Sequence, residues 1–165
     1  MNRITWCKFI LLMTDLLVLF SSLFIAYEVL DIARDGHFYF PLEEFDVYVL
    51  IHACISIVGV LWFWIRLRHY TYRKPFWFEL KEIFRTLVIL FIIELAIVAF
   101  SRLYVSRYFW SVTWCCIFIL LPFARVMVKK LLIKTGMYLK ETIIIGNGRN
   151  AKEVFDALNN ESYLG

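Results

Sequence analysis

Hydrophobic residues in this chain gather into four long blocks, each bounded by charged or turn-forming residues. A helix needs about 20 predominantly apolar residues to cross the hydrocarbon core of a bilayer. The blocks cover residues 9–27, 47–65, 86–101 and 108–128. The pattern predicts an all-α membrane fold, a bundle of four transmembrane helices within residues 1–138. The third block is short, so a full crossing there depends on Arg85 and Arg102 reaching outward from its two ends.

The first block follows a short basic head that contains Arg3 and Lys8, and so it also fits a secretory signal peptide. However, no small-x-small cleavage motif follows it, and three further apolar blocks do. We therefore expect an uncleaved membrane anchor.

Lys and Arg are distributed unevenly around the blocks. The head carries two, the stretch Arg66–Arg85 carries six, and the stretch after the fourth block carries four. The other side carries an acidic loop, residues 31–46, and few cations. Because cytoplasmic loops are enriched in Lys and Arg, both chain ends are expected in the cytoplasm.

The last 27 residues, 139–165, have a different pattern. Thr142–Ile145 is rich in β-branched residues, a glycine turn follows, and Ala151, Val154 and Phe155 then share one helical face with Leu158. This order predicts the first βα unit of a cytoplasmic Rossmann-like α/β domain. A lone unit cannot bury its apolar face, so we expect further strands to complete it.

The composition agrees with the membrane prediction. Hydrophobic residues make up 62% of the chain and charged residues 19%, whereas soluble domains have about half apolar and a quarter charged residues. The net charge of +4 is carried beside the apolar blocks, which argues against nucleic-acid binding. The four cysteines lack metal-ligand spacing and are expected to pack as small apolar residues.

Three ionisable residues lie at membrane depth: Asp15, Glu94 and Arg125. Such residues usually face the bundle interior or a partner. Asp15 and Arg125 both lie toward the cytoplasmic ends of their blocks, so we predict a structural ion pair between the first and fourth helices. Glu94 lies near the midplane. It fits either a hydrogen-bonded structural acid or the carboxylate of a small proton-coupled exporter.

The basic stretch contains the run Pro75-Phe76-Trp77-Phe78 next to Arg73 and Lys74. Aromatic rings beside cations suit a segment in the membrane interface, with the rings at the acyl boundary and the charges on lipid phosphates. We expect Arg73, Lys74, Phe76, Trp77 and Phe78 to contact lipid. An ordinary basic loop with buried aromatic residues is the alternative.

The glycine turn, Gly146-x-Gly148-x-x-Ala151, has the outline of a dinucleotide-binding turn. Backbone N–H groups at the start of the following helix could hold a phosphate at Gly146 and Gly148. The acidic residue that would support a nucleotide site falls about 20 residues on, beyond Gly165. No nucleophile–base pair, metal cluster or carboxylate dyad is evident, so we predict no catalytic residue, cofactor or metal site in this chain.

The sequence resembles the large bacterial polyprenyl-phosphate sugar-1-phosphate transferases, and especially the undecaprenyl-phosphate galactose phosphotransferases. The matching residues are His69-Tyr70-Thr71, Arg73 to Leu80, Ser101-Arg102, Pro122, Arg125, Ile143 to Gly148, Asn150-Ala151, Ala157-Leu158 and Tyr163-Leu164-Gly165. Together they extend over nearly the whole chain.

The resemblance implies a multi-pass protein of the bacterial inner membrane. It also implies a separate catalytic domain with an Asp-Glu dyad and Mg²⁺, which transfers a sugar phosphate from a UDP-sugar to undecaprenyl phosphate. This chain would then be the anchoring module of such an enzyme, in contact with membrane lipids, with the rest of the transferase and with a second copy in a homodimer. Two functions stay open: this anchor, and a self-contained four-helix transporter that uses Glu94.

Overall fold

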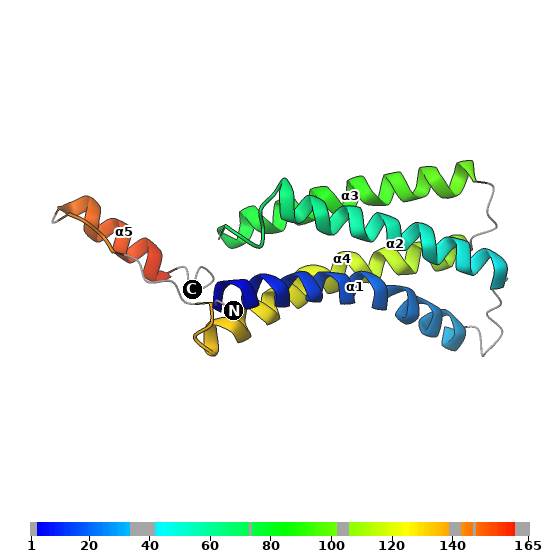
Figure 1. Cartoon of the computed structure of the whole chain (residues 1–165), viewed down its shortest axis with the longest axis horizontal. Helices are drawn as coiled ribbons and strands as arrows, with labels where there is room; N and C mark the ends of the chain where they lie inside the picture. Colours follow the sequence, from blue (N-terminus) through cyan, green and yellow to red (C-terminus); the bar gives the residue numbers. More distant parts are fainter. Residues whose placement is uncertain are drawn as a thin grey trace.

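The computed structural model describes residues 3–33, 42–72, 74–101, 106–138, 143–146 and 148–160. All regular structure in these residues is helical. The helices are α1 (Arg3–Ala33), α2 (Leu42–Ile65), α3 (Phe76–Phe100), α4 (Arg107–Lys134) and α5 (Arg149–Asn160). Figure 1 shows α1 to α4 lying lengthwise beside one another, with the shorter α5 standing clear of them.

The four long helices are each long and apolar enough to cross a membrane, which confirms the four predicted spans. The candidate spans are Thr5–Ala33, Phe45–Ile65, Phe76–Phe100 and Arg107–Lys134. The chain is therefore a multi-pass membrane protein built on an all-helical bundle.

The third helix begins earlier than the predicted third span. It starts at Phe76 rather than near residue 86, and it has 25 residues. The ten additional residues include Glu79 and Glu82, whose charges hid the helix in the hydropathy pattern. The structure pairs Glu79 with buried cations of α4 and Glu82 with the partly exposed Lys74, so neither charge prevents the helix from continuing.

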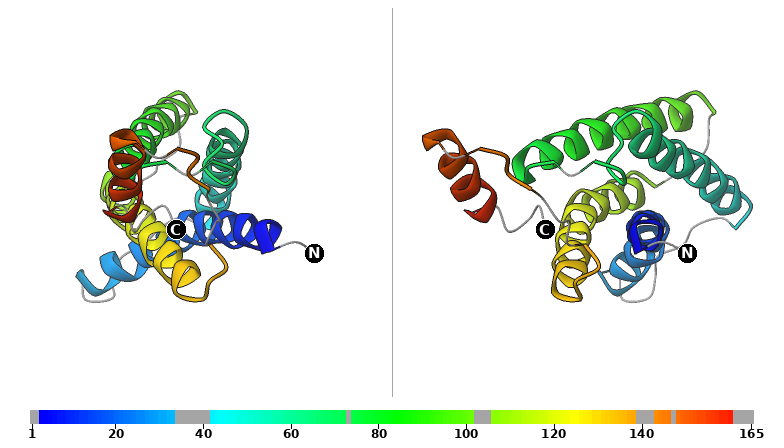
Figure 2. Two further views of the ribbon diagram at one scale, coloured as in Figure 1. Left: turned by 90° about the vertical axis from the view of Figure 1, so that its left-hand side faces the viewer. Right: turned by 60° about the vertical axis from the view of Figure 1, so that its left-hand side comes forward.

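The long helices form a ring in which α1 packs most extensively on α4, α2 lies between α1 and α3, and α3 closes on α4 (Figure 2). Large rings fill the space between α3 and α4. Phe84 stacks on Phe118 with centroids 6.1 Å apart, and Phe91 lies 4.4 Å from Trp110. On the other side of α3, Gly59 of α2 gives room to Leu90, because a Cβ atom there would lie 2.6 Å from Leu90 Cδ1.

The chain leaving α4 folds back on the bundle. Gly136 ends the helix with φ 70°, a conformation that favours glycine. The backbone N–H of Tyr138 then donates to the carbonyl of Leu132 at 3.0 Å. Cys7 of α1 donates its S–H to the carbonyl of Met137 at 3.2 Å. These contacts fix the exit of the chain beside the start of α1.

Residues 143–146 form no strand in the structure, and Thr142 lies outside the described residues. A strand requires a neighbour for its backbone hydrogen bonds, and the described residues offer none here. The helix predicted after the glycine turn is present as α5. The boundary between the two predicted domains, at residues 138 and 139, stays a prediction.

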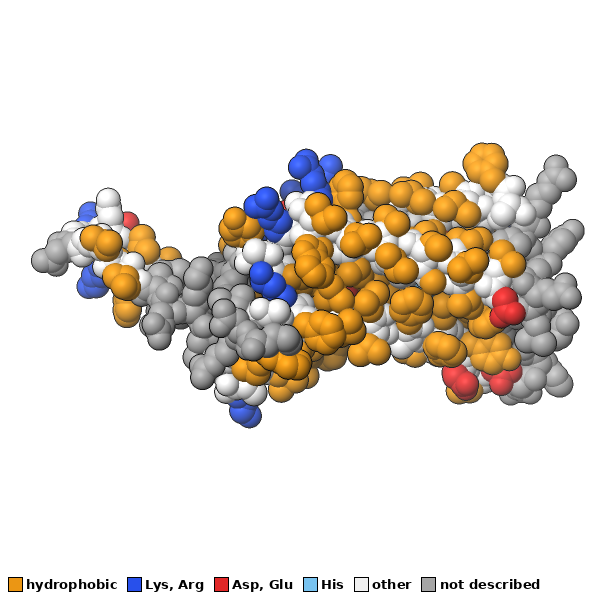
Figure 3. Space-filling view, viewed as in Figure 1, with side chains coloured by type: hydrophobic (Ala, Val, Ile, Leu, Met, Phe, Trp, Pro, Cys, Tyr) orange, Lys and Arg blue, Asp and Glu red, His pale blue; other side chains and the backbone are white. Residues whose placement is uncertain are grey.

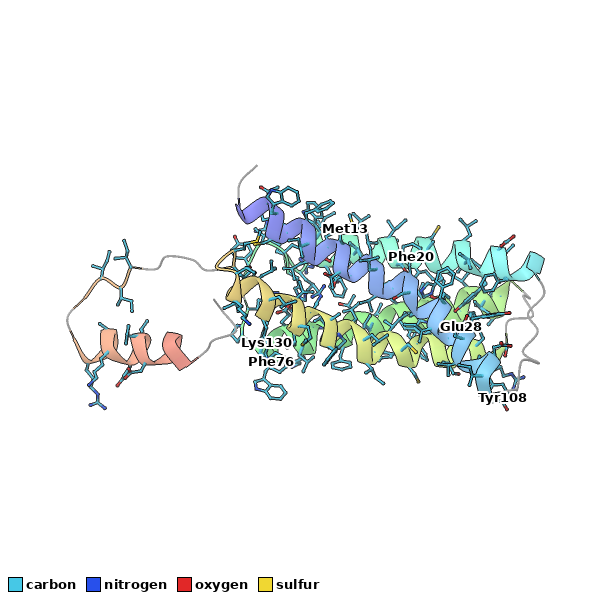
Figure 4. The ribbon with its side chains drawn as sticks, turned by 90° about the horizontal axis from the view of Figure 1, so that it is seen from below. Met13, Phe20, Glu28, Phe76, Tyr108 and Lys130 are labelled. Atoms are coloured by element: carbon cyan, nitrogen blue, oxygen red, sulfur yellow. The ribbon has the colours of Figure 1, made fainter. Side chains whose placement is uncertain are left out.

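Charge separates along the bundle. In Figure 3, Lys and Arg gather at the end nearest α5, hydrophobic side chains cover the middle, and the visible acidic side chains of the bundle lie at the far end. Figure 4 places Phe76 and Lys130 together at the first end, and Glu28 and Tyr108 at the second.

Candidate functional site

The site most densely built from charged residues lies inside the basic end of the bundle and centres on Arg125 of α4. Its Nε donates to Asp15 Oδ1 at 2.8 Å, and its Nη2 donates to Asp15 Oδ2 at 2.5 Å. The ion pair expected from the sequence is therefore present, in a bidentate form. Both side chains are almost completely buried.

The other nitrogen of the same guanidinium faces α3 and the loop before it. Arg125 Nη1 lies 3.3 Å from Glu79 Oε1 and 2.6 Å from His69 Nδ1. The ring of Phe63, at the end of α2, lies under the guanidinium at 4.4 Å. This side chain of α4 thus contacts α1, α2, α3 and the segment between α2 and α3.

Glu79 also receives a hydrogen bond from Lys129, one turn beyond Arg125. Lys129 lies 6.0 Å from the ring of Tyr138, so this pair also reaches the segment that leaves α4. Because Glu79 is the only carboxylate of the first turn of α3, its two cationic partners hold the beginning of that helix against α4.

His69 joins the centre to the surface. A guanidinium can only donate, so His69 Nδ1 must accept from Arg125, and its Nε2 must carry the proton that it donates to Glu82 Oε2 at 2.7 Å. His69 is therefore neutral. Burial first, and then the charge of Arg125, lower its pKa to about 2. Lys74 Nζ reaches the same Glu82 oxygen at 2.5 Å.

Tyr70 lies beside the same pair. Its hydroxyl donates to Asp15 Oδ2. Burial, followed by the charge of Asp15, raises the pKa of this phenol, so it stays protonated and remains a donor. The loop between α2 and α3 is thus fixed to α1 as well as to α4.

The charges in this network balance. Its three carboxylates, Asp15, Glu79 and Glu82, face its three cations, Arg125, Lys129 and Lys74, while His69 is neutral. A buried charge is tolerated only when it is paired and hydrogen-bonded. The arrangement suits a structural role, holding the helices together, better than a catalytic one, because the Arg125 guanidinium has no open side left for a substrate.

A second polar cluster lies deeper in the bundle, around Glu94. Tyr48 donates to Glu94 Oε1 at 2.8 Å, and His52 Nδ1 lies 3.0 Å from Glu94 Oε2. His52 Nε2 lies 3.2 Å from the carbonyl of Leu19, which can only accept, so Nε2 carries a proton. The cluster therefore joins α1, α2 and α3.

The contact between His52 and Glu94 requires one shared proton, because two lone pairs at 3.0 Å would repel. If the proton is on the carboxyl, both groups are neutral, and if it is on the ring, the two charges cancel. The pair is neutral in both cases, which suits its complete burial.

The predicted interfacial residues fall on the first turn of α3 and just before it. Phe76 is partly buried, whereas Trp77 and Phe78 expose 77% and 55% of their surfaces. Lys74 pairs with Glu82 and lies 5.5 Å from the ring of Phe78. Arg73 lies outside the described residues. Lipid contact by these residues stays a prediction.

The glycine turn leads into α5 as predicted. Gly146 has φ 144°, and the carbonyl of Gly148 accepts from the N–H of Ala151 at 3.0 Å. Residues 143–146 and 148–151 line an open depression together with Val154. Phosphate binding there stays a prediction. Within the described residues, no group of three or more His, Cys, Asp and Glu side chains could hold a metal. The resemblance implies Mg²⁺ for a separate catalytic domain.

Sequence reasoning missed seven members of the two clusters, which were not singled out as site residues: Tyr48, His52, His69, Tyr70, Glu79, Glu82 and Lys129. A signal existed for two of them. Tyr48 and His52 are four residues apart, so they share the helical face that meets Glu94.

Three curated proteins are similar to this chain. An uncharacterized sugar transferase of Haemophilus influenzae is 53% identical over the whole chain. An undecaprenyl-phosphate galactose phosphotransferase of Salmonella typhimurium is 47% identical over 96% of it. A UDP-galactose-lipid carrier transferase of Erwinia amylovora is 47% identical over 76%. The chain is a relative of these bacterial sugar transferases.

The resemblance inferred from the sequence is thereby confirmed. The match covers 35%, 34% and 26% of these three proteins, so the chain spans about a third of their length or less. No protein-family model matches the chain.

Proposed function

We propose that this chain is the membrane-anchoring module of a transferase that moves a sugar 1-phosphate from a UDP-sugar to undecaprenyl phosphate. The names of two relatives make galactose 1-phosphate the proposed sugar phosphate. The product would begin a surface polysaccharide such as an O-antigen, a capsule or an exopolysaccharide. One observation carries the proposal: the part matched to much longer transferases contains four membrane-capable helices.

The module would lie in the bacterial inner membrane with both ends in the cytoplasm. Support comes from the charge distribution, since the described cations gather at the end of the bundle that holds the start of α1 and the end of α4. A UDP-sugar is a cytoplasmic substrate, so α5 and whatever follows it would be on the side where the reaction occurs.

The remaining two thirds of such a protein would supply the chemistry. They would complete the Rossmann-like domain that we expect to begin at residue 139, and they would hold the Mg²⁺ for which the described residues have no ligand set. A homodimer, as the resemblance implies, would be formed by the assembled protein.

The transporter alternative has no support. Its proposed carboxylate, Glu94, is completely buried and already bonded to Tyr48 and His52. The comparisons give no transporter among the similar proteins.

A fusion protein tests the proposal. Residues 1–165 are joined to the part of the Salmonella relative that the match does not cover, and membranes are assayed for transfer of labelled galactose phosphate from UDP-galactose to undecaprenyl phosphate. The expected result is membrane-bound activity near that of the relative itself, with little activity when the anchoring part is deleted. An inactive fusion that is inserted and soluble in detergent as a folded protein would contradict the proposal.

A further inference from the structure

The first three turns of α3 have two faces of opposite character. The inner face buries Glu79, Ile83 and Thr86. The outer face exposes the side chains of Trp77, Phe78, Lys81, Phe84 and Arg85. Helical spacing places Trp77, Lys81 and Arg85 one above the other, four residues apart.

The outer face is cationic because the carboxylates of this stretch are occupied elsewhere. Glu79 is bonded to Arg125 and Lys129, and Glu82 to His69 and Lys74. Among the residues that the structure describes, Lys81 and Arg85 make no ion pair. Their charges are therefore available to a ligand on the lipid side.

The depth of these cations matches that of a phosphate layer. At 1.5 Å per residue, Lys81 lies about 28 Å along the helix from Phe100, close to the roughly 30 Å thickness of the hydrocarbon core. Arg85 starts about 6 Å deeper and can reach back to the same level. Below them, Val88 and Ile92 expose 44% and 56% of their surfaces, as expected for contact with acyl chains.

We propose that the outer strip of α3, formed by Trp77, Lys81 and Arg85, binds the headgroup of an anionic phospholipid of the surrounding bilayer. The two cations bond the phosphate, the indole lies at the headgroup level, and the acyl chains run along Val88 and Ile92. The surface is an open helix face rather than a closed pocket, so it suits an abundant, exchanging bilayer lipid instead of one retained polyprenyl phosphate.

This inference rests on the proposed insertion of the bundle in a bilayer, but not on the transfer reaction. An inactive fusion protein that still inserts would leave it standing. Conversely, loss of lipid preference in an active protein would contradict this inference alone.

Fluorescence quenching in reconstituted vesicles tests the proposal. The probes are brominated phosphatidylglycerol and brominated phosphatidylcholine, and the signal of Trp77 is the difference between the protein and its Trp77→Phe variant. We expect at least a five-fold preference for phosphatidylglycerol at Trp77, since each surface cation attracts an anionic lipid by about that factor. The preference should fall to less than two-fold in Lys81→Gln/Arg85→Gln.

Two control variants make the test specific. Lys130→Gln/Lys134→Gln removes the same charge from exposed positions on α4 at the same end of the bundle and should keep the preference. Lys81→Arg/Arg85→Lys should also keep it, because both cations remain. An equal loss of lipid preference in the α4 variant would overturn the proposal, and so would the lack of any preference in the unaltered protein. It would also be overturned if an equimolar dose of undecaprenyl phosphate displaced the brominated phosphatidylglycerol but the same dose of unbrominated phosphatidylglycerol did not.

Discussion

Arg125 Nη2 lies 2.5 Å from Asp15 Oδ2, and this buried pair joins the last of the four long helices to the first. The two residues are 110 positions apart in the chain. The same guanidinium contacts His69 and Glu79, so the pair is the centre of a network and not an isolated salt bridge. Its removal should therefore affect the whole basic end of the bundle.

Arg125→Leu is expected to lower the free energy of unfolding by about 3–5 kcal/mol, because Asp15 would keep a buried charge without its cationic partner and Glu79 would lose one of its two cations. Lys130→Leu, at an exposed neighbouring position, should change it by less than about 0.5 kcal/mol. The measurement is the fraction of protein that stays monodisperse in detergent after heating.

The double variant Asp15→Leu/Arg125→Leu supplies the control for that prediction. It should lose less stability than the sum of the two single variants, because neither charge is then left alone. Equal thermal stability of Arg125→Leu and the unaltered protein would show that the network does not hold the bundle together.

His69 gives the bundle a pH dependence of predictable sign. Its pKa is about 2 in the folded protein and about 6.5 in an unfolded chain, so below pH 6.5 the unfolded chain binds a proton that the folded protein does not. Stability is therefore lost as the pH falls from 6.5, by up to about 1.4 kcal/mol per pH unit. His69→Gln should show a smaller decrease between pH 7 and pH 5 in the same heating assay. An identical pH profile for both proteins would contradict this account.

Replacing Glu94 by an amide should cost less stability than replacing it by an apolar side chain. Glu94→Gln keeps atoms that can bond Tyr48 and His52, so we expect a loss of less than about 1.5 kcal/mol. Glu94→Leu leaves a buried hydroxyl and a buried ring nitrogen without a partner, which costs about 1–3 kcal/mol for each group. Thermal melts in detergent compare the two variants. Equal losses would mean that the hydrogen bonds of this cluster contribute little.

Gly59 sets the spacing of α2 and α3. Gly59→Val should cost about 1–3 kcal/mol, because the added carbons meet Leu90. Gly59→Ala should cost less, since the end of the Leu90 side chain can move. In the double variant Gly59→Val/Leu90→Ala the space returns, and part of the stability should return with it. A Gly59→Val protein as stable as the unaltered one would show that the helices are not closely packed there.

The sequence was sufficient to predict the long apolar helices, because crossing a bilayer requires a continuous apolar stretch, which is visible in the order of the residues. It was also sufficient for Asp15 and Arg125, since two opposite charges at similar depth in a bundle have few other partners. The helix after the glycine turn was predicted for a similar reason, from Ala151, Val154 and Phe155 on one face.

The rest depended on three-dimensional packing. In the sequence, the charges of Glu79 and Glu82 suggest a polar loop. Only the structure shows that Lys129 and His69 bond these carboxylates, which explains why the helix includes them. The partner of Glu94 was not predictable from its depth alone. His52 also lies in an apolar block, but the register between α2 and α3 that brings the two together is set by the packing of many side chains.

The most direct test of the proposed anchor is its orientation in the inner membrane. Alkaline phosphatase, active only outside the cytoplasm, and green fluorescent protein, fluorescent only inside it, are fused in parallel after Ala33, Tyr72, Ser101 and Asn160. The account predicts phosphatase activity after Ala33 and Ser101, and fluorescence after Tyr72 and Asn160. Phosphatase activity after Tyr72 or Asn160 would contradict it, because the network around Arg125 and the start of the transferase domain would then lie on the wrong side of the membrane.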